Sequence, residues 1–499
     1  MSKIPSTTTK SFFGAAICAA LSLAAGSAQA ITPFQLDVGT AIDRGITYLA
    51  TAGAFNNPSS AGNASGLAMQ ALLEKRASGN PGDPPQGYSG ANAVDQGRLK
   101  TAAAYILDKV NNTGFYAYAD GQWIFALSSY ALSGGPDKSV LAPANINYQS
   151  IKEAMDTLVS RTVSNQNAAG YWCYNDGNCN DSSTTQFAVA GLHAAKSFYA
   201  SASSGDQAYA DPVKLGLVNT ALTKSQAAYV NNASGTGSDN GSCNVLTATE
   251  RGHGYHPSNE GYKPSMQQTA SGIYIQLFGG SDVNTPMVQN YMQWVKNRYR
   301  YSDLDSMGNG FQSLTWSYYM WSSFKAMEVI RQSGTTVNAG NIGPNEFGTL
   351  PAANAPACNQ RQENKVPASL VRVASFGAGG VGYYAAETKG QYFDYAHQIL
   401  NMQCADGAFT CTGYPGAWDT YSHQAYLLLV LQRSTGNLVQ RCDVDGDGDV
   451  DSNDIGLIRA AIGQVPGAGD TRDANSDGKI TIVDVRQCTM KCTRANCAP

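Results

Sequence analysis

The chain has 499 residues, with 37 acidic residues against 33 lysines and arginines, so its formal net charge is −4. This near-neutral balance lacks the basic footprint of nucleic-acid-binding proteins, so we expect no nucleic-acid partner. A hydrophobic content of 43% excludes a disordered chain, and the length allows about two to four domains.

Residues 1–30 have the three parts of a secretory signal peptide. Lys3 and Lys10 give a positive start, residues 12–25 are apolar, and residues 28–30 read Ala-Gln-Ala, the small-x-small pattern of a cleavage site. The apolar run is short for a bilayer span, and no later stretch approaches that length. We therefore expect no membrane span after signal cleavage, and a protein that is secreted or held at the cell surface.

The cysteines indicate an oxidising compartment. Eleven are present and Cys18 lies in the signal peptide, so ten remain, an even number that is typical of disulfides in exported proteins. By position they form four groups: Cys173 with Cys179, Cys404 with Cys411, Cys243 with Cys358, and a C-terminal cluster of Cys442, Cys488, Cys492 and Cys497. Spacing alone does not determine the pairing. Zinc binding by the C-terminal cluster is the alternative, disfavoured because paired CxxC motifs and histidines are missing there.

Between residues 37 and 433 the sequence repeats a pair of helical patterns. Each pair has an amphipathic stretch, a loop with glycine and an aromatic residue, and a second, more apolar stretch. The first helices are expected at residues 37–52, 97–112, 147–165, 212–231, 286–300 and 389–404. The second helices are expected at residues 61–76, 120–133, 183–200, 265–279, 311–332 and 419–434.

Helical pairs of this size cannot each bury a core, so they must stack against one another. The second helices are apolar around much of their surface, and we therefore expect them inside a closed ring, with the amphipathic helices outside. An open solenoid of the same hairpins is the alternative. The predicted fold class of this region is all-α, a double-layered barrel of about six helical hairpins.

Two of the connecting loops share a Q-x-x-x-G-x-aromatic pattern, at residues 166–172 and 403–409. The glycine ends a helix in a left-handed conformation, the aromatic ring covers the turn, and the glutamine can bond backbone groups. At these residues the chain resembles the prenyltransferase and squalene-cyclase repeat superfamily. The resemblance covers most of residues 37–434 and implies an α/α toroid for a domain of residues 31–440, without implying a reaction.

The catalytic motifs of that superfamily are incomplete here. Its cyclases protonate an olefin with a D-x-D-D acid, whereas Asp303-Leu-Asp305 lacks the third carboxylate. Its protein prenyltransferases hold zinc with an Asp-x-Cys pair and a later histidine. The segment with Asp419 and His423 is similar but has one extra residue, and no Asp-x-Cys precedes it. A terpenoid cyclase-like enzyme therefore remains only a second alternative.

Five residues are the candidates for chemistry in the helical region. Glu250, His253 and His256 form its densest polar cluster, just before an expected second helix, and histidine near carboxylates suits acid–base chemistry or metal binding. Asp419 and His423 lie at the start of another second helix. The competing interpretation is a hydrogen-bonded loop with structural histidines.

Aromatic residues at loops and second-helix starts suggest a further role. With Asp181, Gln186, Asp419 and His423 they can line a sugar-binding cleft at the toroid mouth. They are Trp123, Trp172, Tyr255, Trp316, Trp418 and Tyr421. The alternative function is therefore a carbohydrate-active enzyme, a polysaccharide lyase or glycoside hydrolase, with a polysaccharide as its partner; a packed helical core explains the same residues.

Residues 441–499 hold the clearest motif. Two twelve-residue segments carry oxygen-bearing side chains at positions 1, 3, 5, 9 and 12, glycine at position 6 and an apolar residue at position 8, and position 7 offers its carbonyl. The expected metal-binding residues are Asp443, Asp445, Asp447, Asp449, Asp451 and Asp454 in the first loop, and Asp473, Asn475, Asp477, Lys479, Thr481 and Asp484 in the second. This density of oxygens is what calcium requires. Val450 and Ile480, at position 8, are expected to pack the loops together.

The spacing resembles a type I dockerin, in which Asp rather than Glu closes each loop. The resemblance implies a two-EF-hand-like domain at residues 441–499, calcium as its folding ligand, and a cohesin-like protein domain as a partner in extracellular assembly. In that family, loop positions 10 and 11 help to read the partner. Here they are Ser452 and Asn453 in one loop and Ile482 and Val483 in the other, so we expect no symmetric docking surface. The first hypothesis is thus a secreted protein with a docking module and a toroid of unassigned binding or scaffold role.

Overall fold

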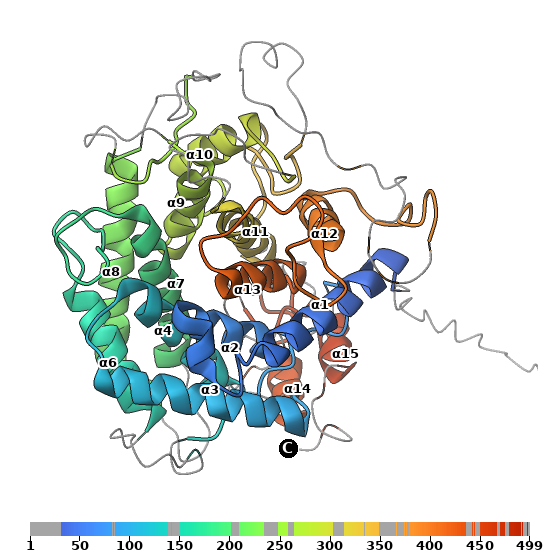
Figure 1. Ribbon diagram of the computed structural model, residues 1–499, viewed down its shortest axis with the longest axis horizontal. Coiled ribbons are helices and arrows are strands. Elements are labelled where there is room, and N and C mark those ends of the chain that lie inside the picture. The colour runs from blue at the N-terminus through green and yellow to red at the C-terminus, as the bar shows by residue number, and fades with distance from the viewer. Residues whose placement is uncertain are drawn as a thin grey trace, which may run out of the picture. The chain divides into compact units, whose positions relative to one another are not determined.

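Figure 1 shows the computed structural model. The structure describes residues 31–81, 83, 85–137, 141, 150–200, 209–233, 248–257, 264–302, 314–333, 335–348, 366, 374, 376, 379–435, 442, 444, 450–466, 470–474, 479–490, 492 and 497. The predicted signal peptide, the Asp303 motif and the predicted Cys243–Cys358 pair lie outside these residues.

The helices alternate as the sequence predicts. The first helices of the pairs are α1 (Pro33–Thr51), α3 (Ala93–Asn112), α6 (Ile151–Ser164), α8 (Pro212–Asn231), α10 (Pro286–Asn297) and α12 (Gln391–Met402). The second helices are α2 (Ser65–Leu73), α4 (Ala117–Leu132), α7 (Ser182–Ala200), α9 (Met266–Phe278), α11 (Trp316–Ser333) and α13 (Thr420–Leu431). Their ends agree with the predicted ranges to within a few residues. A 3-10 helix, η1 (Pro58–Ala64), replaces the predicted start of α2.

Polar caps begin several of the first helices. Thr32 and Ser150 each form a capping box, and the side chains of Asn92 and Asp211 accept bonds from the free amides of the first turn. Such caps satisfy backbone donors that have no partner inside the helix. The helix starts are therefore encoded locally.

Burial separates the two kinds of helix. All residues of α2 and nearly all of α4 and α9 are buried. In contrast, α8 buries one stripe, whose members recur at intervals of one, three or four residues: Val218, Ala221, Leu222, Ser225, Ala228 and Tyr229. This pattern is that of an amphipathic helix packed by one face.

Helix α12 has the amphipathic spacing that the sequence predicts, yet almost every residue of it is buried. Parts of the long connection before it supply the cover. The backbone amide of Val366 donates to Asp394 at 2.8 Å, and the ring of Tyr384 packs against Phe393 with centroids 6.4 Å apart. The predicted amphipathic pattern is present in α12, but its polar residue Asp394 is bonded to the preceding connection instead of facing solvent.

The second helices contact one another in chain order among the described residues. Helix α2 packs against α4, α4 against α7, α7 against α9, α9 against α11, α11 against α13, and α13 against α2 (Figure 1). Most first helices lie against two consecutive second helices, as α3 does with α2 and α4 and α8 does with α7 and α9. The sequence of neighbours thus returns to its starting helix.

The glutamines of the two Q-x-x-x-G-x-aromatic loops join each pair to the next. Gln166 Nε2 donates to the carbonyl of Ala221 in α8 at 2.9 Å. Gln403 Nε2 donates to the carbonyl of Ala41 in α1, also at 2.9 Å. The last pair therefore binds the first helix of the chain in the way that the third pair binds the fourth.

The glycines of these loops make the same close approach. Gly170 and Gly407 have φ values of +92° and +96°, in the left-handed region that favours glycine. A Cβ on Gly170 would collide with the carbonyl of Lys224 in α8, and a Cβ on Gly407 with that of Arg44 in α1. Glycine is needed here both for its conformation and for its lack of a side chain.

The C-terminal module, described by itself, contains α14 (Ser452–Ala460) and α15 (Ile482–Met490), which pack together. Asp451 caps α14 and forms a capping box with Asp454. Among the described residues, no helix is both long and apolar enough to cross a membrane. Their β-structure is limited to one isolated antiparallel bridge, between Trp172 and Asp181.

Candidate functional site

Equivalent carboxylates close the two loops of the C-terminal module. Asp454 Oδ1 accepts a bond from the backbone amide of Val444 at 2.6 Å, and its Oδ2 accepts one from the amide of Asp451 at 2.9 Å. The Asp484 carboxylate makes the corresponding bonds, at 2.9 and 2.7 Å, to the amides at positions 2 and 9 of the second loop. Position 12 therefore has the same internal role in both loops.

The described carboxylates of the predicted metal site are buried. Asp451, Asp454 and Asp484 are at most 1% exposed and Asp473 is 7% exposed, and carboxylate oxygens are the ligands that calcium takes. Within the described residues alone, no three His, Cys, Asp or Glu side chains form a metal-binding group. Six of the predicted ligands lie outside the described residues: Asp443, Asp445, Asp447, Asp449, Asn475 and Asp477.

A small core joins the two halves of the module. Val450 and Ile480, at position 8 of each loop, are 1% exposed and belong to one buried cluster with Ile455, Ile458 and Val485. The prediction that they pack together is confirmed.

Disulfides brace both regions. Cys442 and Cys488 are bonded across the module, and Cys492 is bonded to Cys497. The predicted pairs Cys173–Cys179 and Cys404–Cys411 are present. Because the C-terminal cysteines are bonded to one another, they are not zinc ligands.

Comparison with known proteins identifies the module. Residues 440–489 match the family model of the Dockerin type I domain. Type I dockerin domains bind calcium, so calcium is the cofactor of this module, as the sequence predicts. No curated protein and no solved structure matches the chain.

Glu250 lies inside the protein, in an ion pair. Its side chain is wholly buried, its Oε1 is 2.9 Å from Arg298 Nη2, and Asn297 donates to its other oxygen. Burial lowers the pKa of the Arg298 guanidinium, and the Glu250 carboxylate opposes that shift. This carboxylate holds the end of α10 and is not exposed to a substrate.

His253 is equally enclosed. Its Nδ1 lies 2.8 Å from the Gly254 carbonyl, so Nδ1 carries the proton, and its Nε2 accepts a bond from the Tyr171 hydroxyl at 2.9 Å. Its ring stacks on Tyr229 with centroids 4.1 Å apart. Burial lowers the pKa of His253 to about 4, which keeps it neutral at physiological pH. The geometry therefore favours the structural interpretation of the predicted cluster.

His256 is half-buried, and its Nδ1 lies 2.9 Å from the carbonyl of Asn180, in the loop that precedes α7. It therefore ties two loops together. The predicted grouping of Glu250, His253 and His256 thus separates into three different local environments.

Asp419 and His423 also serve separate purposes. Asp419 caps α13 by accepting a bond from the amide of Ser422 at 2.6 Å. His423 is 1% exposed, and its Nε2 donates to the carbonyl of Phe409 at 2.7 Å. Burial lowers the pKa of His423 to about 4. These roles do not resemble a metal-binding pair.

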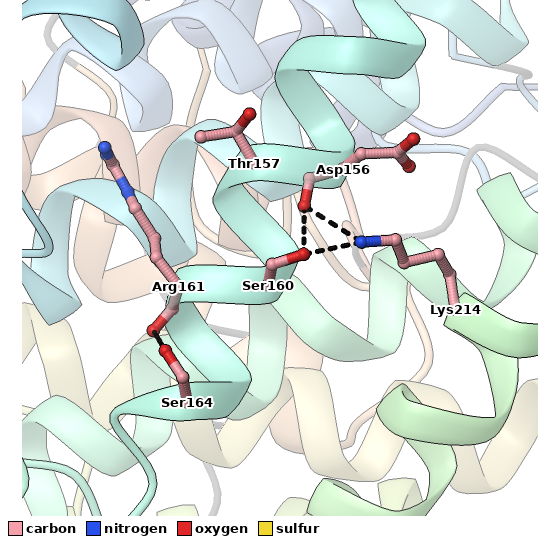
Figure 2. A pocket seen from close by; sticks show the side chains of 6 residues that line it. All are labelled: Asp156, Thr157, Ser160, Arg161, Ser164 and Lys214. Atoms are coloured by element: carbon pink, nitrogen blue, oxygen red, sulfur yellow. Dashed lines mark hydrogen bonds between the residues drawn. The ribbon is translucent and has the colours of Figure 1, made fainter.

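A shallow groove lies between α6 and α8, away from these candidates. Figure 2 shows Lys214 pointing toward α6, where its Nζ donates to Ser160 Oγ at 2.5 Å and to the Asp156 carbonyl at 3.3 Å. The groove is lined by Asp156, Thr157, Ser160, Arg161, Ser164 and Lys214. These bonds connect neighbouring helices and give no sign of a ligand site.

Sequence reasoning missed a caged lysine. Lys325 in α11 is 1% exposed, and its Nζ lies 4.7 to 5.7 Å from the ring centroids of Phe125, Tyr274, Phe278 and Trp321. Burial lowers the pKa of Lys325 to about 7, which Glu74 partly opposes. A lysine inside an otherwise apolar helical pattern was the available signal.

Proposed function

We propose that this protein is secreted or held at the cell surface, and that its C-terminal module docks the chain onto a cohesin-like domain in an extracellular assembly. The observation that carries the proposal is the match of residues 440–489 to the type I dockerin family. The repeated carboxylate-to-backbone bonds of Asp454 and Asp484 support two equivalent calcium loops. The module occupies residues 441–499 in this proposal.

Exposed apolar side chains lie in both halves of the module, Leu457, Ile462 and Val465 in the first and Ile482 and Val483 in the second, but the two halves differ at loop positions 10 and 11. Ile482 and Val483 are 51% and 44% exposed, although apolar side chains of this size are usually buried. The corresponding residues of the first loop, Ser452 and Asn453, are exposed but polar. This difference supports a single docking orientation.

For the rest of the chain, an α/α toroid of the prenyltransferase and squalene-cyclase repeat type is the proposed architecture of residues 31–440. The neighbour order that returns from α13 to α2 supports it. So does the bond from Gln403 to Ala41, which repeats the bond from Gln166 to Ala221. In an open solenoid, the loop at residues 403–409 would not contact α1.

A binding or scaffold role suits this region better than catalysis by the predicted residues. His253 and His423 are buried and neutral, and Glu250 is engaged by Arg298. A general acid or base must reach its substrate. These residues therefore lend no support to a carbohydrate-active enzyme or a terpenoid cyclase.

Surface plasmon resonance with immobilised type I cohesin domains tests the docking proposal. We expect binding in calcium that is lost in EDTA, and at least tenfold weaker binding by an Ile482→Asp, Val483→Asp variant. Val381→Asp is the matched control, because Val381 is 82% exposed and lies in the helical region. Equal binding by the variant and the control would contradict the proposed surface, and absence of binding to every cohesin in calcium would contradict docking.

A further inference from the structure

Four tyrosines meet on the helical region and form a patch, of which sequence reasoning singled out Tyr255 alone. This tyrosine patch consists of Tyr116, Tyr118, Tyr174 and Tyr255. The ring centroids of Tyr116 and Tyr118 are 6.0 Å apart, and those of Tyr118 and Tyr174 are 5.8 Å apart. The hydroxyls of Tyr174 and Tyr255 are 2.5 Å apart. Tyr174 is 36% exposed and the other three are half-buried.

The backbone that carries the patch is rigidly held. The loop with Tyr174 is closed by the Cys173–Cys179 disulfide, and the carbonyl of Tyr174 accepts a bond at 2.8 Å from the amide of Ala117, at the start of α4. The carbonyl of Tyr255 accepts a bond at 3.0 Å from the amide of Ser182, at the start of α7. Partly exposed aromatic rings are therefore fixed before any ligand arrives, which lowers the entropic cost of binding.

The hydroxyls of Tyr118, Tyr174 and Tyr255 are neutral and hydrogen-bonded. Tyr118 donates to Ser183 Oγ at 2.7 Å, and Ser183 donates to Asp181 at 2.6 Å. Burial raises the phenol pKa of Tyr118, Tyr174 and Tyr255, and the nearby Asp181 carboxylate raises each further. The phenols thus stay protonated at physiological pH.

The charge around the patch disfavours anionic ligands. Asp181 is the carboxylate beneath it and is 1% exposed. A nucleic acid or an acidic polysaccharide would bring negative charge toward this carboxylate, whose field reaches Tyr118, Tyr174 and Tyr255.

We propose that the tyrosine patch binds a neutral polysaccharide. A pyranose ring has a face of C–H groups that packs on an aromatic ring and a rim of hydroxyls that bonds to phenols, and tyrosine offers both surfaces in one side chain. Asn175, exposed next to Tyr174 in the disulfide-closed loop, adds an amide group. The proposal is independent of docking, because it uses residues of the helical region alone.

Affinity electrophoresis of the full chain tests it, in native gels containing soluble β-glucan, xylan or galactomannan, with polygalacturonate as the acidic comparison. We expect retardation by at least one neutral polysaccharide and none by polygalacturonate. Tyr174→Ala should lower the association constant at least tenfold, whereas Tyr174→Phe, which keeps the ring, should lower it less. Tyr105→Ala is the matched control, because Tyr105 is a half-buried tyrosine on α3.

Thermal unfolding of each variant separates loss of binding from loss of fold, and all gels are run in EDTA without cohesin so that docking does not contribute. Retardation that disappears in Tyr174→Ala, with an unchanged melting temperature, supports the patch. Three outcomes would overturn it: no retardation by any of the three neutral polysaccharides, retardation by polygalacturonate alone, or full retardation of Tyr174→Ala.

Discussion

The helical region and the C-terminal module reach stability by different means. Among the described residues, the helical region buries one large apolar cluster to which both helices of every pair contribute, whereas the cluster of the module contains nine buried residues. A domain as small as the module buries too little apolar surface to be stable by packing alone, and a disulfide or a bound metal commonly compensates. The Cys442–Cys488 bond and the two calcium loops fit that requirement.

The largest expected loss of stability concerns the disulfide of the module. It closes 46 residues, and in the chain-entropy model loss of such a cross-link costs about 4 kcal/mol. A Cys442→Ser, Cys488→Ser variant should unfold its module in EDTA while the helical region keeps its melting temperature. Hydrogen exchange of residues 450–466 and 479–490 measures this.

The Cys173→Ser, Cys179→Ser variant is the control, because that bond closes a much shorter loop. Its cost should be about 2 kcal/mol and should fall on the helical region. If hydrogen exchange of the module amides is unchanged in the Cys442→Ser, Cys488→Ser variant, packing alone is enough to keep the module folded.

The next largest loss of stability is expected from disrupting the contact between the last helical pair and α1. Gly407→Ala should destabilise the helical region by about 3 kcal/mol, because the new Cβ meets the carbonyl of Arg44 and φ is +96°. Gly97→Ala is the control: Gly97 lies in α3 with open space around it, and alanine there should stabilise by about 0.5–1 kcal/mol. Calorimetry that finds both variants equally stable would contradict the tight closure.

The caged lysine should respond to pH. The pKa of Lys325 falls from 10.5 to about 7 on folding, so the unfolded chain binds more protons between these values and stability rises with pH across that window. Lys325→Met should stabilise the helical region below pH 7 by about 2–5 kcal/mol, the upper value following from 1.36 kcal/mol per pKa unit.

The advantage of Lys325→Met should shrink between pH 7 and pH 10.5 and vanish above it. The cation–π contacts of Lys325 offset part of its desolvation cost. The expected stabilisation by Lys325→Met can therefore be smaller than the value that the pKa shift alone gives. Urea unfolding at several pH values tests this, and an advantage that is independent of pH would show that burial does not shift this amine.

The smallest expected effect is on calcium binding, and it is tested by matched substitutions in the two calcium loops. Asp454→Asn and Asp484→Asn should each weaken calcium binding and lower the stability of the calcium-bound module by about 1–2 kcal/mol, because each removes a charged acceptor with the same backbone bonds. Lys479→Ala should leave calcium binding unchanged, since position 7 contributes its carbonyl. Calorimetric calcium titration separates these outcomes, and a large difference between the two aspartates would show that the loops are not equivalent.

The sequence predicted local features well. Helix periodicity located all twelve helices of the repeated pairs, because burial of one face leaves its spacing in the chain. Sequence reasoning also recognised three kinds of short motif: the loops at residues 166–172 and 403–409, the two close cysteine pairs and the calcium-binding spacing. Each of these features depends on residues that are near in sequence.

The candidate catalytic residues were predicted less well. A polar cluster in the sequence does not reveal that His253 stacks on Tyr229, or that Glu250 pairs with Arg298. Whether a polar side chain is exposed or enclosed depends on helices that arrive from elsewhere in the chain.

By itself the sequence determined where helices form, which loops need glycine, and that the C-terminal aspartates have the spacing for calcium, since these follow from local backbone and charge requirements. Only the tertiary structure decided that α12 is covered, that Lys325 is caged by aromatic rings, and that Tyr174 meets Tyr255 from 81 residues away. The physical reason is that burial and contact are properties of neighbours in space, and a linear pattern does not specify which distant segments those neighbours are.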